Sequence, residues 1–132
     1  MKQYEFLEHT ADILFKAYGS SFEEALSNAA LALFETVGFS KSPKNKIELE
    51  VQAKNKEELV VKLLSEILTE MDINEMTFKK IKILELNENY VKANVYGDDT
   101  RPKDSVKAVT YHLLEVKNPK PDMWTIQILL DV

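Results

Sequence analysis

Hydrophobic and polar residues follow two different periods along this chain. Several short stretches show the signals of strands, either an alternation of two residues or a high content of β-branched and aromatic residues. Two longer stretches have hydrophobic residues at the helical spacing of three to four. The strand signals predict strands at 12–18, 47–53, 81–86, 90–96, 106–116 and 124–130. The helical spacing predicts amphipathic helices at 22–37 and 56–71.

Each predicted helix begins after a residue that caps helices well. Ser20 or Ser21 precedes the first helix, and the Glu23-Glu24 pair supplies the carboxylate partner of a capping box. Asn55 precedes the second helix, which has two glutamates in its first turn. Gly38 is suited to end the first helix. The order strand, cap and amphipathic helix therefore occurs twice, as a weak internal resemblance.

Turn-forming residues separate the remaining strands. Asn87-Glu88-Asn89 predicts a hairpin turn, and Asn118–Asp122, with its two prolines, predicts a turn before the last strand. The β-branched and aromatic run Val106–Val116 is predicted to be one long strand. We therefore expect a single α+β domain over residues 1–132, a two-layer sandwich in which a mostly antiparallel or mixed sheet is packed by two amphipathic helices.

The composition excludes several kinds of functional site. The chain has no cysteine, which excludes disulfides, zinc–thiolate sites, iron–sulfur clusters and thiol catalysis. Its three glycines, Gly19, Gly38 and Gly97, lie too far apart for a phosphate-binding loop. The net charge of −5 argues against a large nucleic-acid-binding face and leaves room for a small basic patch.

The chain also lacks the signals of membrane insertion and secretion. No apolar run approaches the roughly 20 residues of a membrane helix. The N-terminal residues lack the apolar core of a signal peptide. Together with the absence of cysteine, these features predict a cytoplasmic protein without a membrane partner.

Acidic groups at the two ends of the chain form the first candidate site. Asp131-Val132 follows the last predicted strand directly, which would hold the Asp131 carboxylate and the terminal carboxylate of Val132 side by side. If Asp12 joins them, the cluster presents three hard oxygen ligands, as in Ca²⁺ or Mg²⁺ sites. In the alternative interpretation Asp12 caps a turn and Asp131 is simply solvated.

Two histidines and one lysine are further candidates. His9 and His112 are the only histidines, and each is either a ligand or general base, or a residue with local hydrogen bonds. His112 shares strand parity with Val106 and Ala108, which favours a side chain that faces the core. Lys107 is either an outward-facing strand lysine or a cation held near the acidic cluster or aimed at a phosphate.

Four segments together resemble one known family. They are His9-Thr10-Ala11-Asp12, the strand followed by Gly19 and a Ser-capped helix with Glu23-Glu24-Ala25, the run Val106–His112, and the ending on an apolar strand, Asp131 and an aliphatic residue. In this order and at these distances they resemble the archease family, and the resemblance covers essentially the whole chain.

The resemblance implies a protein cofactor rather than an enzyme. It implies an activator of the RtcB-type RNA ligase of tRNA splicing, which promotes guanylylation of the ligase's active-site histidine and multiple turnover, with RNA contacted only indirectly. It further implies a metal site formed by Asp12, Asp131 and the terminal carboxylate of Val132, with Ca²⁺ or another divalent cation such as Mg²⁺ or Mn²⁺. Lys107 and His9 are then the residues of partner contact and activation.

Two other functions remain open on the residues alone, and so does the oligomeric state. A metal-dependent phosphoester hydrolase would use Asp12, Asp131 and a bound water. A chaperone-like binding module would need no metal. Phosphoester hydrolysis lost in Asp131→Ala would favour the first alternative, and metal-independent binding of varied unfolded proteins would favour the second.

Overall fold

Seven strands and two helices make up the domain, and a computed structural model describes all 132 residues. Every strand pair is antiparallel, and the strands form a four-stranded sheet in the order β1-β2-β7-β6 and a three-stranded sheet in the order β3-β5-β4. The elements are β1 (Tyr4–Leu7), β2 (Ile13–Gly19), α1 (Phe22–Val37), β3 (Asn45–Gln52), α2 (Lys56–Asn74), β4 (Thr77–Asn87), β5 (Tyr90–Asp98), β6 (Ala108–Lys120) and β7 (Met123–Asp131).

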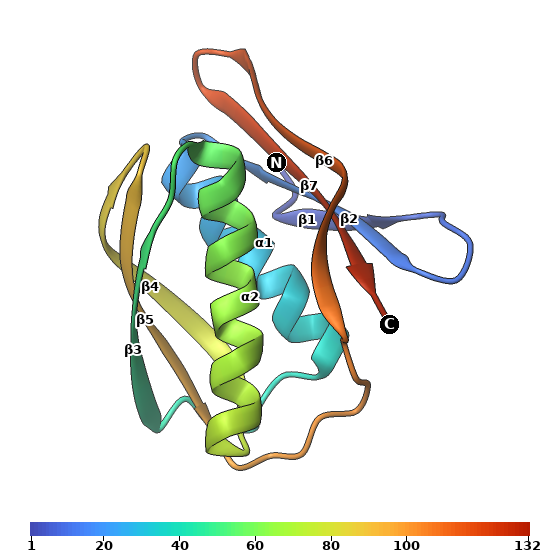
Figure 1. Cartoon of the computed structure of the whole chain (residues 1–132), viewed down its shortest axis with the longest axis vertical. Coiled ribbons are helices and arrows are strands. Elements are labelled where there is room, and N and C mark those ends of the chain that lie inside the picture. The colour runs from blue at the N-terminus through green and yellow to red at the C-terminus, as the bar shows by residue number, and fades with distance from the viewer.

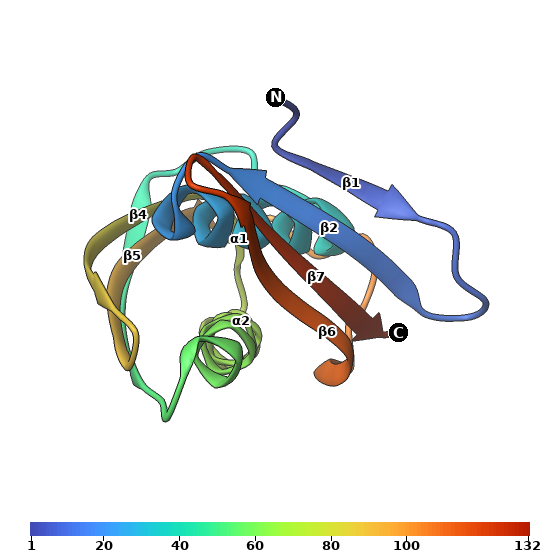
Figure 2. The same ribbon diagram turned by 90° about the horizontal axis from the view of Figure 1, so that it is seen from above.

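Both helices lie between the two sheets, so the predicted α+β sandwich is confirmed (Figure 1 and Figure 2). α1 packs against β2 and β4, and α2 packs against β6 and β3. α1 is buried on nearly all sides because small residues such as Ala25, Ala29 and Ala32 let both sheets approach its backbone. Gly19 lies so close to the backbone of Ala25 that a Cβ atom would overlap it.

Both predicted caps and both ends of α1 are confirmed, while α2 ends at Asn74 rather than at residue 71. Ser21, rather than Ser20, caps α1, and its Oγ accepts the N–H of Glu24 at 3.0 Å while the Glu24 carboxylate accepts the N–H of Ser20 at 2.8 Å. α1 ends at Gly38, whose φ of 113° lies in the region that glycine tolerates. The caps therefore follow local sequence chemistry.

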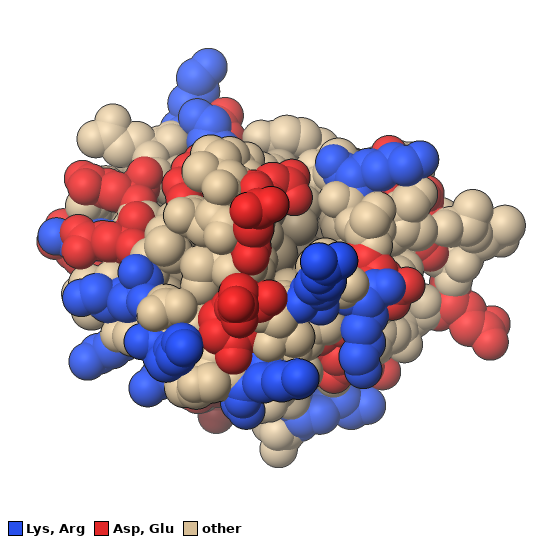
Figure 3. All heavy atoms as spheres, turned by 90° about the horizontal axis from the view of Figure 1, so that it is seen from below, with Lys and Arg blue, Asp and Glu red and all other residues tan.

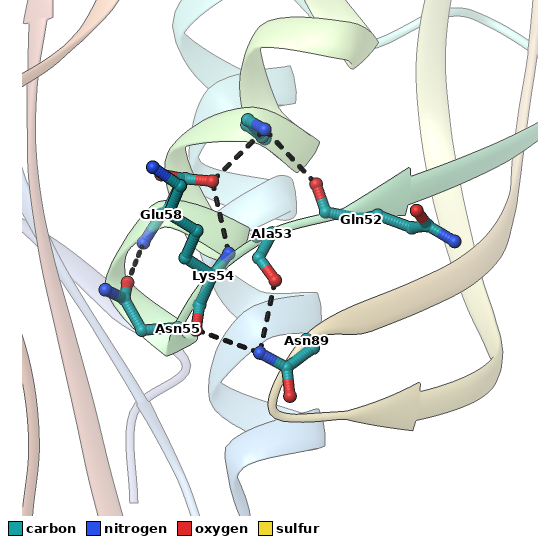
Figure 4. Close-up of polar contacts among 7 residues, drawn as sticks. Gln52, Ala53, Lys54, Asn55, Glu58 and Asn89 are labelled. Carbon is teal, nitrogen blue, oxygen red and sulfur yellow. Dashed lines mark hydrogen bonds and ion pairs between the residues drawn. The ribbon is translucent and has the colours of Figure 1, made fainter.

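The start of α2 is held by a closed set of hydrogen bonds (Figure 4). The Asn55 side chain caps the helix by accepting the N–H of Glu58 at 2.8 Å. The Glu58 carboxylate accepts the N–H of Lys54 at 3.2 Å and pairs with the Lys62 ammonium at 3.1 Å. The same ammonium donates to the carbonyl of Gln52 at 3.3 Å. Each of these groups thus bonds to another over about the first two turns of the helix.

Asn89, in the turn between β4 and β5, ties this region to the three-stranded sheet. Its side chain donates to the carbonyls of Ala53 and Lys54 at 3.2 and 2.9 Å, and its own carbonyl accepts the N–H of Ala53 at 2.8 Å. We call this bonded region the α2 junction and define it as Gln52, Ala53, Lys54, Asn55, Glu58, Lys62 and Asn89.

One strand was missed in the prediction, and several strand boundaries differ from it. β1 was not predicted at all, and β4 begins at Thr77 rather than at Ile81. β6 begins at Ala108 rather than at Val106, and it continues through Asn118 to Lys120, where a turn was predicted. Pro119 is tolerated there because β6 is the edge strand of its sheet, so no neighbour needs the missing N–H.

The predicted inward orientation of His112 was also wrong. Thr110 pairs with Leu129 but Glu115 pairs with Gln127, so β6 carries extra residues between these two pairs. Leu113 in this bulge has a φ of 60°, and His112 is exposed. A bulge of this kind resets the alternation of side chains, so parity counted from Ala108 does not extend past it.

Neither helix is long and apolar enough to cross a membrane.

Candidate functional site

Three chain segments meet at one end of the four-stranded sheet. Ile13 pairs with Leu130, so Asp12 and Asp131 lie at the same end of neighbouring strands β2 and β7. Ala108 pairs with Asp131 on the other side, and the N–H of Lys107 donates to the Asp131 carbonyl at 2.7 Å. Figure 2 shows the C-terminal end of β7 beside the start of β2. We call this end the tip and define it as Asp12, Lys107, Asp131 and Val132.

A tight turn sets the direction of Asp12. The N–H of Asp12 donates to the carbonyl of Thr10 at 2.9 Å, which closes a three-residue turn around Ala11. Ala11 has a φ of 71°, a conformation that costs a residue with a Cβ roughly 1–2 kcal/mol. Backbone strain of this kind often occurs at functional sites, where the surrounding structure maintains it.

The charged groups of the tip lack partners within the protein. Asp12 and Asp131 are half-buried, and Val132 is 37% exposed. Neither aspartate side chain takes part in a hydrogen bond or an ion pair, and the same holds for the ammonium of Lys107. Leu130 next to Asp131 is fully buried, so the backbone that carries these groups is anchored in the core.

The tip carries two carboxylate side chains, those of Asp12 and Asp131. Carboxylate oxygens are the ligands that Ca²⁺, Mg²⁺ and Mn²⁺ prefer. The chain has no cluster of three or more His, Cys, Asp or Glu side chains suited to a metal ion. A site here would therefore need ligands beyond these two side chains.

The other predicted residues lie apart from these carboxylates. His9 is exposed in the connection between β1 and β2, where it lines a shallow hollow with Leu7, Glu8 and Thr10. His112 is exposed on the bulge of β6. The structure thus brings together Asp12, Asp131, Val132 and Lys107. Neither histidine belongs to a cluster of side chains that could bind a metal ion.

The bulge of β6 presents apolar side chains that sequence reasoning missed. Tyr111 is 57% exposed and Leu113 is 41% exposed, and the side chain of Gln127 donates to the Leu113 carbonyl at 2.9 Å. The continuous β-branched and aromatic pattern of this run gave no local signal of a bulge. Exposed apolar residues on an edge strand are candidates for contact with another protein.

A cavity of about 620 Å³ adjoins the tip and was also unforeseen. It opens between the end of α2 and the connection from β5 to β6, and Val106 on its wall directly precedes Lys107. Its walls carry more acidic than basic side chains, namely Asp72, Glu75, Asp99 and Asp104 against Arg101. These residues come from segments far apart in the sequence, so no local pattern predicts their meeting.

Elsewhere, carboxylates are held by donors. A hydrogen bond from Tyr18 lowers the pKa of Glu5, and burial followed by this bond raises the pKa of Tyr18 to about 12. The hydroxyl and N–H of Thr100, then the N–H of Ser42, lower the pKa of Asp98. Their donors give these carboxylates structural roles that the carboxylates of the tip do not share.

Comparison with known proteins identifies the family. The sequence profile of the Archease protein family matches residues 4–132. The protein archease of Pyrococcus abyssi is 36% identical with full coverage of both chains, and that of Methanosarcina mazei is 36% identical over 99% of this chain and 97% of its own.

Two solved structures are similar to this one. The solution structure of protein 1598 of Methanobacterium thermoautotrophicum is 30% identical, covers all of both chains and has a TM-score of 0.78. The crystal structure of an archease from Thermotoga maritima, titled a possible chaperone, is 25% identical over 96% of this chain and 94% of its own, with a TM-score of 0.72. Because profile, relatives and fold agree over the whole length, this chain belongs to the archease family.

Proposed function

We propose that this chain activates an RtcB-type RNA ligase in tRNA splicing by promoting guanylylation of the ligase and its multiple turnover. In this proposal the chain is a protein cofactor and the ligase performs the chemistry. Membership of the archease family supports the proposal. The tip supplies a surface with which such a cofactor would act.

The observation that carries the proposal is the convergence of unpartnered carboxylates on rigid strand ends. Asp12 and Asp131 come from opposite ends of the chain, yet they end neighbouring strands whose paired residues are anchored in the core. Like charges placed close together repel each other unless a cation separates them. A fold that maintains such an arrangement without internal partners is arranged for a ligand from outside.

Asp12, Asp131 and the carboxylate of Val132 would hold the divalent cation, for which Ca²⁺ is our first candidate and Mg²⁺ and Mn²⁺ are alternatives. When bound, the cation supplies positive charge that stabilises phosphate oxygens of a nucleotide. Lys107 would place a second positive charge beside it, since its backbone is bonded to Asp131. His9 would contact the ligase from the exposed connection before Asp12.

The test is a ligase guanylylation assay, with and without this protein and with chelator as the second variable. Asp12→Ala, Asp131→Ala and deletion of Val132 should each abolish stimulation while the domain stays folded. Asp122→Ala, in the turn between β6 and β7, removes an equal charge away from the tip and should leave stimulation unchanged. Normal stimulation by the folded tip variants would contradict the site assignment.

A chaperone-like function is the second candidate. The Thermotoga maritima archease is titled a possible chaperone, and the exposed Tyr111 and Leu113 would give this chain an apolar contact surface. On this proposal, suppression of aggregation would persist in chelator and in Asp131→Ala, and would be lost in Tyr111→Ser/Leu113→Ser. Dependence of that activity on Asp131 would instead assign it to the tip.

A further inference from the structure

Six lysines gather on one corner of the three-stranded sheet. This corner is positively charged, although the whole chain has a net charge of −5. Lys46 on β3 and Lys80 on β4 both pair with Tyr96 on the central strand β5, and Lys82 pairs with Asn94 on the same face. We call this corner the lysine patch and define it as Lys41, Lys44, Lys46, Lys79, Lys80 and Lys82. Seen from below, blue side chains gather on the side of this sheet (Figure 3).

The positive charge of the lysine patch is not neutralised within the protein. The five ion pairs of the chain use other lysines, Lys2, Lys56, Lys62, Lys92 and Lys117. All six lysines of the patch are exposed. Unpaired like charges on one face favour an anionic partner, since they raise its local concentration and its rate of association.

Two of the acids near the lysine patch, Glu48 and Asp98, are already engaged, and Glu50 and Glu85 lie further along the same face, where both pair with Lys92 in the register. Glu48, which pairs with Asn94 in the register, binds the ammonium of Lys92 at 3.5 Å. Asp98 is buried, and its carboxylate accepts the N–H groups of Ser42 and Thr100 at 3.0 and 2.9 Å. Neither carboxylate therefore supplies the missing partner of the patch.

An aromatic ring lies at the centre of these lysines. The ammonium of Lys80 lies 5.2 Å from the centre of the Tyr96 ring. Lys46 and Lys80 flank Tyr96 on neighbouring strands, roughly 5 Å away on each side by strand spacing. Lys80 and Lys82 are about 7 Å apart along β4 by the rise of an antiparallel strand. A ring with cations around it suits a base that stacks while its backbone phosphates meet the ammonium groups.

Asn94 adds an acceptor that has no partner. Its side chain is 7% exposed and its Oδ1 atom has no hydrogen-bond partner in the protein. Its Nδ2 atom donates to the Tyr96 hydroxyl at 3.5 Å, so the amide lies beside the ring that would stack. A buried acceptor without a partner is unfavourable, and a donor from a bound molecule would satisfy it once the surrounding side chains move aside.

We propose that the outer face of the three-stranded sheet binds single-stranded RNA, with the lysine patch on the phosphates and Tyr96 stacked on a base. A membrane surface is less well matched because the patch combines its lysines with one aromatic ring rather than with an apolar surface. The proposal goes beyond the ligase proposal by placing RNA contact on this chain itself. It is tested without the ligase, so either proposal can fail alone.

The experiment measures fluorescence anisotropy of a labelled single-stranded RNA of about 12 nucleotides against the purified full chain over a salt series. Lys46→Gln/Lys80→Gln/Lys82→Gln should weaken binding roughly tenfold or more, and the slope of log affinity against log salt should fall by about 2. Lys2→Gln/Lys117→Gln/Lys120→Gln, which changes the net charge equally on β6 and just before β1, should have a much smaller effect.

Stacking is tested separately at the central strand. Tyr96→Leu should weaken binding roughly tenfold while Tyr96→Phe, which keeps the ring, should stay close to the wild type. Circular dichroism and thermal unfolding confirm that each variant is folded. Guanylylation of the ligase with GTP and no RNA should be stimulated normally by the patch variant, and Asp131→Ala should bind RNA normally.

Several outcomes would overturn the proposal. One is the absence of RNA binding at low salt, and another is an equal loss in the patch variant and in the control triple variant. If Tyr96→Leu leaves RNA binding unchanged, no base stacks on Tyr96. Binding of vesicles that contain phosphatidylserine, through the same lysines and without RNA binding, would assign the face to a membrane instead.

Discussion

The α2 junction and the tip both gather polar groups at the end of strands, and they treat those groups in opposite ways. At the α2 junction Asn55, Glu58 and Asn89 all use their side-chain oxygens or nitrogens within the protein. At the tip the side chains of Asp12 and Asp131 have no such partner. Polar groups at strand ends thus contribute to stability in one region and stay available to an outside ligand in the other.

Only the α2 junction gains stability from its polar groups. Hydrogen bonds of the α2 junction each contribute about 1 kcal/mol to stability. The carboxylates of Asp12 and Asp131 make no such contribution, because neither has a hydrogen-bond or ion-pair partner within the protein. The strand that carries Asp131 is held instead by Ile128 and Leu130, whose side chains are fully buried.

Cation binding at the tip should change the stability of the protein most. Ca²⁺ at about 100 times its Kd should raise the free energy of unfolding of the wild type by about 2.7 kcal/mol, because the cation binds only the folded chain. Asp131→Asn should lose this stabilisation and Asp122→Asn should keep it, as measured by urea unfolding with and without Ca²⁺. Equal stabilisation of both variants would show that the cation binds outside the tip.

The cap of the α2 junction should act on stability alone. Asn55→Ala removes the acceptor of the Glu58 N–H and should lower the free energy of unfolding by about 1 kcal/mol. Asn55→Asp keeps a capping oxygen and should stay within a few tenths of a kcal/mol of the wild type. Ligase stimulation by both folded variants should be normal, and its loss in Asn55→Ala would contradict the division of roles between the two regions.

Substitution of alanine by glycine should change stability in opposite directions in the two regions. Ala11→Gly relieves the positive φ before Asp12, so stability should be unchanged or raised by up to about 1 kcal/mol while the Ca²⁺ affinity falls. Ala53→Gly in the α2 junction has no such strain to relieve and should lower stability by about 0.5–1 kcal/mol. Chemical unfolding with a Ca²⁺ titration measures both quantities. A large loss of stability in Ala11→Gly would mean that the turn is not strained.

The smallest expected effect is the pH dependence of the α2 junction. The ammonium of Lys62, followed by the N–H of Lys54, lowers the pKa of Glu58 from its usual 4.5. Folding therefore favours the ionised form, and this contribution is complete above the unfolded value and is lost as the pH falls through the lower folded value. Unfolding midpoints from about pH 6 to about pH 3 should converge for the wild type and Glu58→Gln. Glu57→Gln, one residue away, should not reproduce this convergence.

Local sequence patterns were sufficient to predict those elements that depend on contacts between neighbouring residues in the sequence. The two helices, the caps at Ser21 and Asn55 and the turn at Asn87–Asn89 depend on periodicity and on hydrogen bonds within a few residues. Local patterns failed at β1, whose alternation is too short to stand out, and at the bulge of β6, whose extra residues no pattern in the run marks.

The order of residues was enough to predict the helices and their caps, because these depend on residue chemistry and local spacing. It also indicated Asp12, Asp131 and Val132 as candidate ligands, which stays a prediction. Only the tertiary structure decided that β2 and β7 are neighbours, that Lys107 bonds to Asp131, and that Lys46, Tyr96 and Lys80 form one row. Strand pairing joins residues that are remote in the sequence, and burial of the shared core selects the register that brings them together.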